Sequence, residues 1–122
     1  MSAAPPPLLF VTGASSGIGQ ALAARHAQAG HRLALVARRA DEMQAWASAQ
    51  GLGPERCRVY GADVADVNSI VAAGQRCLAE MGLPDVVLAS AGQSIGMDTA
   101  EREDLDVMAP TFALNNVGTA AT

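Results

Sequence analysis

Short apolar runs alternate with amphipathic stretches from one end of the chain to the other. The apolar runs predict strands over residues 8–12, 32–37, 57–60 and 85–89, because strands buried on both faces of a parallel sheet read as continuous apolar segments. Between and after them, three- and four-residue spacing of apolar positions predicts helices over residues 17–29, 41–50, 67–81 and 98–116. This alternation predicts an α/β fold with parallel strands joined by right-handed crossovers, in the order 3-2-1-4.

Residues that typically begin or end helices support these boundaries. Gly30 and Gly51 follow the first two predicted helices as C-terminal caps, and Asp66 is placed to cap the third. The last predicted helix is expected to break near Pro110. The inner face of the first predicted helix is expected to carry Ile18, Ala21, Leu22 and Ala29. The inner face of the third is expected to carry Val67, Ile70, Val71, Gly74, Cys77, Leu78 and Met81.

Composition narrows the class of protein. A length of 122 residues, half of them apolar, allows one domain with its own core. The net charge of −4 and the scattered arginines argue against nucleic acid as a partner. No apolar run approaches the roughly 20 residues of a membrane span. The N-terminus lacks the features of a signal peptide, so we expect a cytoplasmic protein.

Two further residue types favour structural roles over chemistry. Cys57 and Cys77 are too isolated for a disulfide framework or a metal site, and we expect both to be buried, reduced side chains. His26 and His31 are expected to be surface or packing residues. The sequence therefore predicts no metal centre.

The most informative segment is Thr12-Gly13-Ala14-Ser15-Ser16-Gly17-Ile18-Gly19, which joins the first predicted strand to the first predicted helix. Glycines let the backbone turn sharply and approach a ligand closely. The N–H groups and the dipole at the start of the helix then attract an anion such as a phosphate. The alternative is a tight turn without a ligand.

In this turn the sequence resembles the N-terminal half of the short-chain dehydrogenase/reductase family, whose signature is T-G-x-x-x-G-x-G. The resemblance extends from Leu8 to Thr122. It implies the first half of a Rossmann-type doubly wound sheet, with residues 1–122 as the N-terminal part of one dinucleotide-binding domain. It also implies hydride transfer between a nicotinamide cofactor and a small alcohol or carbonyl substrate, and a homo-oligomer at full length. The cofactor-binding residues that it implies in the turn are Gly13, Ser15, Ser16, Gly17, Ile18 and Gly19.

The end of the second predicted strand indicates the type of cofactor. An acidic residue there would bond the ribose 2′-hydroxyl of NAD, but the chain has Ala37 followed by Arg38 and Arg39. Guanidinium groups match a phosphate, so we expect NADP, with NAD the less favoured cofactor. The alternative is a solvated strand end whose arginines are partly neutralised by Asp41 and Glu42.

Three more motifs follow the family pattern. Asp63-Val64 matches a pair that recognises adenine in the family, although Asp63 could simply turn the loop before a helix. Ala91-Gly92 matches the second half of the family's N-N-A-G, while Ala89 and Ser90 replace its two asparagines. The family pattern N-x-x-G aligns Asn115 with the active-site asparagine, and the adjacent Asn116 is the alternative.

The family's catalytic Ser, Tyr and Lys have no match in this chain. The sequence contains no lysine, and Tyr60, its single tyrosine, falls in the third predicted strand. We therefore expect an NADP-dependent short-chain oxidoreductase represented by its cofactor-binding half and inactive as the 122-residue chain alone. The uncapped end at Thr122 favours a truncated chain. The alternative function is a non-catalytic nucleotide-binding or regulatory module.

Overall fold

A computed structural model describes residues 5–15, 17–92 and 102–122 of the chain. Its elements, in chain order, are β1 (Leu8–Thr12), α1 (Gly17–Gln28), β2 (Arg32–Ala37), α2 (Ala40–Ala49), β3 (Cys57–Gly61), α3 (Val67–Glu80), β4 (Val86–Ala89), α4 (Arg102–Phe112), the π-helix η1 (Ala113–Gly118) and α5 (Thr119–Ala121). The predicted strands and the first three predicted helices are confirmed to within one residue at each end.

The sheet has four parallel strands in the order β3-β2-β1-β4, which confirms the predicted topology. β1 is central, and its Val11 pairs with Leu35 of β2 and with Leu88 of β4. Because all four strands are parallel, their carboxyl ends lie along one edge of the sheet. The loops that leave this edge include the glycine turn.

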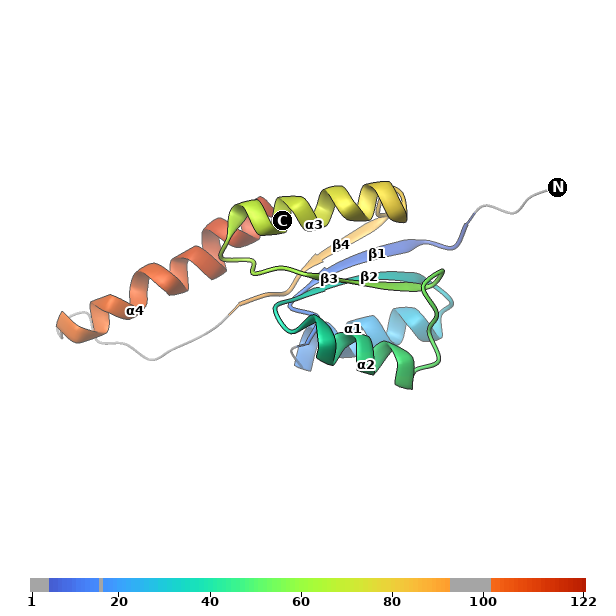
Figure 1. Cartoon of the computed structure of the whole chain (residues 1–122). Helices are drawn as coiled ribbons and strands as arrows, with labels where there is room; N and C mark the ends of the chain where they lie inside the picture. The colour runs from blue at the N-terminus through green and yellow to red at the C-terminus, as the bar shows by residue number, and fades with distance from the viewer. Residues whose placement is uncertain (1–4, 16, 93–101) are drawn as a thin grey trace.

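Helices cover both faces of the sheet (Figure 1). On one face, α1 and α2 pack over Leu9, Val11, Leu33 and Leu35. On the other face, α3 packs over Phe10, Val36 and Tyr60, and side chains from η1 and α5 join the same cluster. Alternate residues of β1, β2 and β3 therefore enter two separate cores, as expected for a three-layer α/β fold.

The predicted inner face of α1 is wrong. Ile18 is 73% exposed, Ala21 and Ala29 are also exposed, and the residues that face the sheet are Gly19 and Ala23. Small side chains four residues apart let the helix lie close against β1 and β2. A pattern of larger apolar residues does not reveal such a face.

The cap of α3 is as predicted, whereas its inner face is predicted only in part. The carboxylate of Asp66 accepts a hydrogen bond from the Ser69 N–H at 3.3 Å. Ile70 and Cys77 are buried as expected, together with Ala73. Val67, Val71 and Leu78 were expected inside but are 39%, 43% and 51% exposed. Val71 and Leu78 line a groove between α3 and β4, which Val87 also lines.

The C-terminal helix was expected to break near Pro110, but its irregular part lies further along the chain. Residues 98–101 of the predicted helix lie outside the described part of the chain. α4 continues through Pro110 to Phe112, and the irregular turn is η1, which begins three residues later. Proline removes one hydrogen-bond donor, and here the helical path persists on both sides of it. In Figure 1, α4 projects away from the sheet, while the C-terminal end of the same helical segment lies against α3.

No helix among the described residues is long and apolar enough to cross a lipid bilayer.

Candidate functional site

A cavity of about 330 Å³ opens at the carboxyl edge of the sheet. Residues from the loops after all four strands line it, together with residues from the helical segment that follows β4. The lining residues are Gly13, Ser15, Val36, Ala37, Arg38, Ala62, Asp63, Val64, Ala65, Ala91, Gly92, Pro110 and Leu114. The structure thus brings together seven residues that the sequence predicted for the site, although they are spread over 80 positions of the chain.

The three glycines of the turn have three different surroundings. Gly13 has a φ of +63°, and a Cβ there would lie 2.7 Å from the backbone of Ala91. A Cβ on Gly19 would collide with the Gly13 carbonyl oxygen and lie 2.8 Å from Ser90 Oγ. A Cβ on Gly17 would meet nothing within 4 Å. Gly13 and Gly19 therefore permit close packing within the protein, whereas Gly17 faces open space at the start of α1.

Two other predicted residues of the turn lie within the described part of the chain. Ser15 lines the cavity, and Ile18 is exposed in the first turn of α1. Ser16 lies outside the described residues.

The two arginines after β2 differ in their surroundings. Arg38 lines the cavity, next to the buried Ala37. Arg39 does not line it, and its Nη1 forms an exposed ion pair with Glu42 Oε1 at 3.3 Å. The structure therefore separates one arginine that borders the cavity from one with a carboxylate neighbour on α2.

Asp63 lies at the cavity wall and also shapes its own loop. Its Oδ1 accepts a hydrogen bond from the Ala65 N–H at 2.9 Å, and its N–H donates to Ser69 Oγ at 2.9 Å. The loop-turning role considered from the sequence is therefore present. A carboxylate has two oxygens and several acceptor sites, so this role leaves acceptor capacity for a ligand.

The π-helix η1 carries both asparagines of the N-x-x-G pattern. Asn115 is half-buried, and its Oδ1 lies 3.2 Å from the position a Cβ on Gly92 would take, whereas Asn116 is exposed. A Cβ on the buried Gly118 would collide with the Val64 carbonyl oxygen and lie 2.6 Å from Val64 Cγ1. Gly118 therefore lets η1 approach the loop after β3. π-helical turns are frequent at functional sites.

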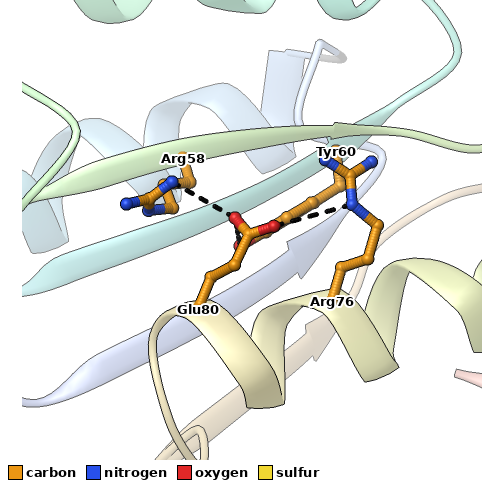
Figure 2. Close-up of polar contacts among 4 residues, drawn as sticks. All are labelled: Arg58, Tyr60, Arg76 and Glu80. Carbon is orange, nitrogen blue, oxygen red and sulfur yellow. Dashed lines mark hydrogen bonds and ion pairs between the residues drawn. The ribbon is translucent and has the colours of Figure 1, made fainter.

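Tyr60 belongs to a polar cluster on α3 and β3 (Figure 2). Its hydroxyl donates to Glu80 Oε2 at 3.1 Å, and the same carboxylate pairs with Arg58 at 3.2 Å and with Arg76 at 3.7 Å. The Arg76 guanidinium lies 5.1 Å from the centre of the Tyr60 ring. Burial and the bond to Glu80 raise the pKa of Tyr60 well above its usual value. Tyr60 is thus a buried strand residue that ties β3 to α3, outside the cavity.

The two cysteines and the two histidines also lie apart from the cavity. Cys57 and Cys77 are free and buried, and burial raises the pKa of the Cys57 thiol to about 11 and that of Cys77 above its usual value. His26 and His31 contact one another through their Nδ1 atoms at 2.9 Å. None of the four lines the cavity.

Sequence reasoning missed two residues that shape the site. Ser90 departs from the family pattern, yet its hydroxyl donates to the Thr12 carbonyl oxygen at 2.5 Å. Gly118 was read only as the end of a motif. For Gly118, a glycine inside a helix was an available signal, because such a residue often marks close packing. For Ser90 the sequence offered no signal.

Comparison with known proteins agrees with this geometry. The family model described as short chain dehydrogenase matches residues 8–122. Over 110 residues the chain is 38% identical to D-threitol dehydrogenase from Mycolicibacterium smegmatis. The matched segment covers 90% of this chain and 42% of that protein. The chain thus spans less than half the length of that relative.

Solved structures show the same fold. A short-chain dehydrogenase/reductase described as a glucose/ribitol dehydrogenase, from Brucella melitensis, superposes with a TM-score of 0.86 at 27% identity, covering 96% of this chain and 48% of that one. A blue fluorescent protein from a metagenomic library, solved in complex with NADPH, superposes with a TM-score of 0.80 at 27% identity, with the same two coverages.

Proposed function

The chain belongs to the short-chain dehydrogenase family, and we propose that it binds a nicotinamide dinucleotide, NADP(H) in preference to NAD(H), in the cavity at the carboxyl edge of its sheet. Residues 1–122 form the N-terminal, cofactor-binding part of one Rossmann-type domain. The activity of the whole protein is hydride transfer between the cofactor and a small alcohol or carbonyl compound. It takes place in the cytoplasm, in a homo-oligomer, without nucleic acid as a partner.

One observation carries this proposal: the glycine turn and Arg38 border the same cavity. The turn leads into the N-terminus of α1, where the open space beside Gly17 leaves room for an anion. Backbone N–H groups at a helix start bind phosphate. The position of the cavity fits the rule that ligands of open α/β sheets bind beyond the carboxyl ends of the strands.

The residues around the cavity can be assigned to the parts of the cofactor. The turn from Gly13 to Gly19, including Ser15 and Ser16, would hold the pyrophosphate, with Ile18 following it in α1. Asp63 and Val64 would contact the adenine, and Ala91 and Gly92 would leave the backbone open beside a ribose. When bound, the cofactor supplies the hydride that the reaction transfers.

Arg38 supports NADP(H) as the cofactor. It follows Ala37 at the end of β2, where an acidic residue would favour NAD. An exposed guanidinium that borders the cavity can form a bidentate pair with the ribose 2′-phosphate. Arg39 is assigned a secondary role, because Glu42 already pairs with it.

Asn115 is the proposed match to the family's active-site asparagine, since it lies against Gly92 at the cavity and Asn116 is exposed. The 122-residue chain alone is proposed to be inactive. It contains no lysine, and the hydroxyl of its single tyrosine is engaged by Glu80 in the cluster on α3.

The absence of lysine and the engaged hydroxyl of Tyr60 also favour the second candidate, a non-catalytic nucleotide-binding module. The intact mass of the natural gene product distinguishes the two functions. A mass near twice 12.4 kDa supports the enzyme, and a mass of 12.4 kDa supports the module.

The cofactor proposal is tested by titrating the chain with NADPH and with NADH and following cofactor fluorescence. We expect tighter binding of NADPH. Arg38→Asp should reduce or reverse the preference by about 1–3 kcal/mol, the value of a hydrogen bond to a charged group. Arg39→Asp makes the same change of charge one residue away and should have a smaller effect. Equal affinities for the two cofactors in the unmutated chain would refute the proposed preference.

A further inference from the structure

We propose that Ser90 is a positioning residue for the glycine turn, and thereby for the pyrophosphate of the bound cofactor. The inference rests on the proposed cofactor site. Ser90 is the residue directly after β4 and does not line the cavity. It stands where the family pattern has an asparagine.

The hydroxyl of Ser90 forms a hydrogen bond at the start of the turn. It donates to the Thr12 carbonyl oxygen at 2.5 Å, and Thr12 is the last residue of β1. This bond joins two positions that are 78 residues apart in the chain. It fixes the direction in which the backbone leaves β1 and enters Gly13.

The same oxygen also lies against the other end of the turn. A Cβ on Gly19 would approach Ser90 Oγ to 2.8 Å, and a Cβ on Gly13 would lie 2.9 Å from the carbonyl carbon of Ser90. Ser90 therefore sits between the first and the last glycine of the turn. Atoms this tightly packed move together, so a shift of residue 90 is transmitted to both ends.

The opposite flank of the turn is attached to β2. The Ala14 N–H donates to the Val36 carbonyl oxygen at 3.3 Å. Two of the bonds that hold the turn between strand ends are thus the backbone bond on the β2 side and the Ser90 bond on the β4 side. Removing the Ser90 hydroxyl would remove its bond on the β4 side, while the strand pairing of β1 with β4 remains.

The experiment compares two ligands that use different parts of the cavity. NADPH presents a pyrophosphate to the turn, whereas adenosine 2′-monophosphate lacks it and can reach only the region of Arg38 and Asp63. Isothermal titration calorimetry measures both affinities for the unmutated chain, Ser90→Ala and Ser90→Thr. Ser48→Ala, an exposed position on α2, is the matched control. Far-UV circular dichroism at the working temperature establishes that each variant is folded.

We expect Ser90→Ala to weaken NADPH binding about 3- to 10-fold, as for the loss of one hydrogen bond, and to leave the binding of adenosine 2′-monophosphate within about 1.5-fold. Ser90→Thr keeps the hydroxyl and should restore most of the NADPH affinity. Ser48→Ala should bind both ligands like the unmutated chain.

Two results would overturn the role of Ser90. Unchanged NADPH affinity in folded Ser90→Ala would show that the bond does not position the turn. An equal loss for both ligands would show a general structural role. Absence of NADPH binding by the unmutated chain would instead overturn the proposed function on which the inference rests.

Discussion

Replacing Gly19 with valine separates close packing in the turn from contact with a ligand. A Cβ at this position would lie 3.0 Å from the Gly13 carbonyl carbon, 2.8 Å from Ser90 Oγ and closer still to the Gly13 oxygen. The backbone of the turn would have to move, at a cost typical of overpacking, about 1–3 kcal/mol of folding free energy. The displaced N–H groups would then no longer face the pyrophosphate. Loss of two hydrogen bonds to a charged group costs about 3 kcal/mol or more, which is roughly a 100-fold loss of affinity.

Gly17→Val is the matched control, because a Cβ at Gly17 meets no protein atom within 4 Å. We expect both variants to lose NADPH binding in a fluorescence titration and to keep most of their far-UV circular dichroism. Only Gly19→Val should lower the midpoint of thermal unfolding. If Gly19→Val binds NADPH as well as the unmutated chain does, the cofactor does not bind at this turn. If Gly17→Val is as unstable as Gly19→Val, the assignment of the two glycines is wrong.

Three further predictions follow from the same structure. The purified 122-residue chain should oxidise NADPH no faster than buffer with a panel of ketones and aldehydes, since a lost acid–base group alone costs about 10²–10⁴ in rate; turnover by a monodisperse 12.4 kDa species would contradict this. The apolar edge strand β4, whose Val87 is 50% exposed, should cause concentration-dependent self-association in size-exclusion chromatography. Val87→Lys should reduce it and Gln44→Lys, on the exposed side of α2, should not; equal elution of all three would refute the role of this edge. Because burial raises the pKa of Cys57 to about 11, the folded state holds its proton more tightly than the unfolded state. The stabilising contribution of Cys57 should therefore be complete below about pH 9 and be lost as the pH rises toward 11, and denaturant unfolding of Cys57→Ala should lack this part of the decline.

The sequence predicted the sheet well because its strands carry strong local signals. Leu8-Leu9-Phe10-Val11 is a continuous apolar run, and a glycine turn directly follows it. Asp66 has the side chain that a helix N-cap needs, and the cap is present. Where the carboxyl ends of parallel strands meet, residues such as Arg38 and Asp63 must come together, so the composition of the cavity wall followed from the topology.

The errors arose where packing depends on small residues. α1 contacts the sheet through Gly19 and Ala23, so the exposed Ile18 was misread as a core residue. Pro110 was taken as a break, whereas the helical path changes at η1, where Gly118 packs on Val64. The bond from Ser90 to Thr12 joins distant segments through a common polar side chain, and no pattern in the sequence predicts it.

We propose that a nicotinamide dinucleotide binds at the carboxyl edge of this sheet. A titration of the ¹⁵N-labelled chain with NADPH, followed by amide chemical shifts, locates the binding site residue by residue. We expect saturable shifts concentrated at Gly13–Gly19, Arg38, Asp63 and Gly92, with small changes at the Tyr60–Glu80 cluster. Saturable shifts centred on α3 and β4, or no saturable shifts at all, would show that the cofactor does not bind at this edge.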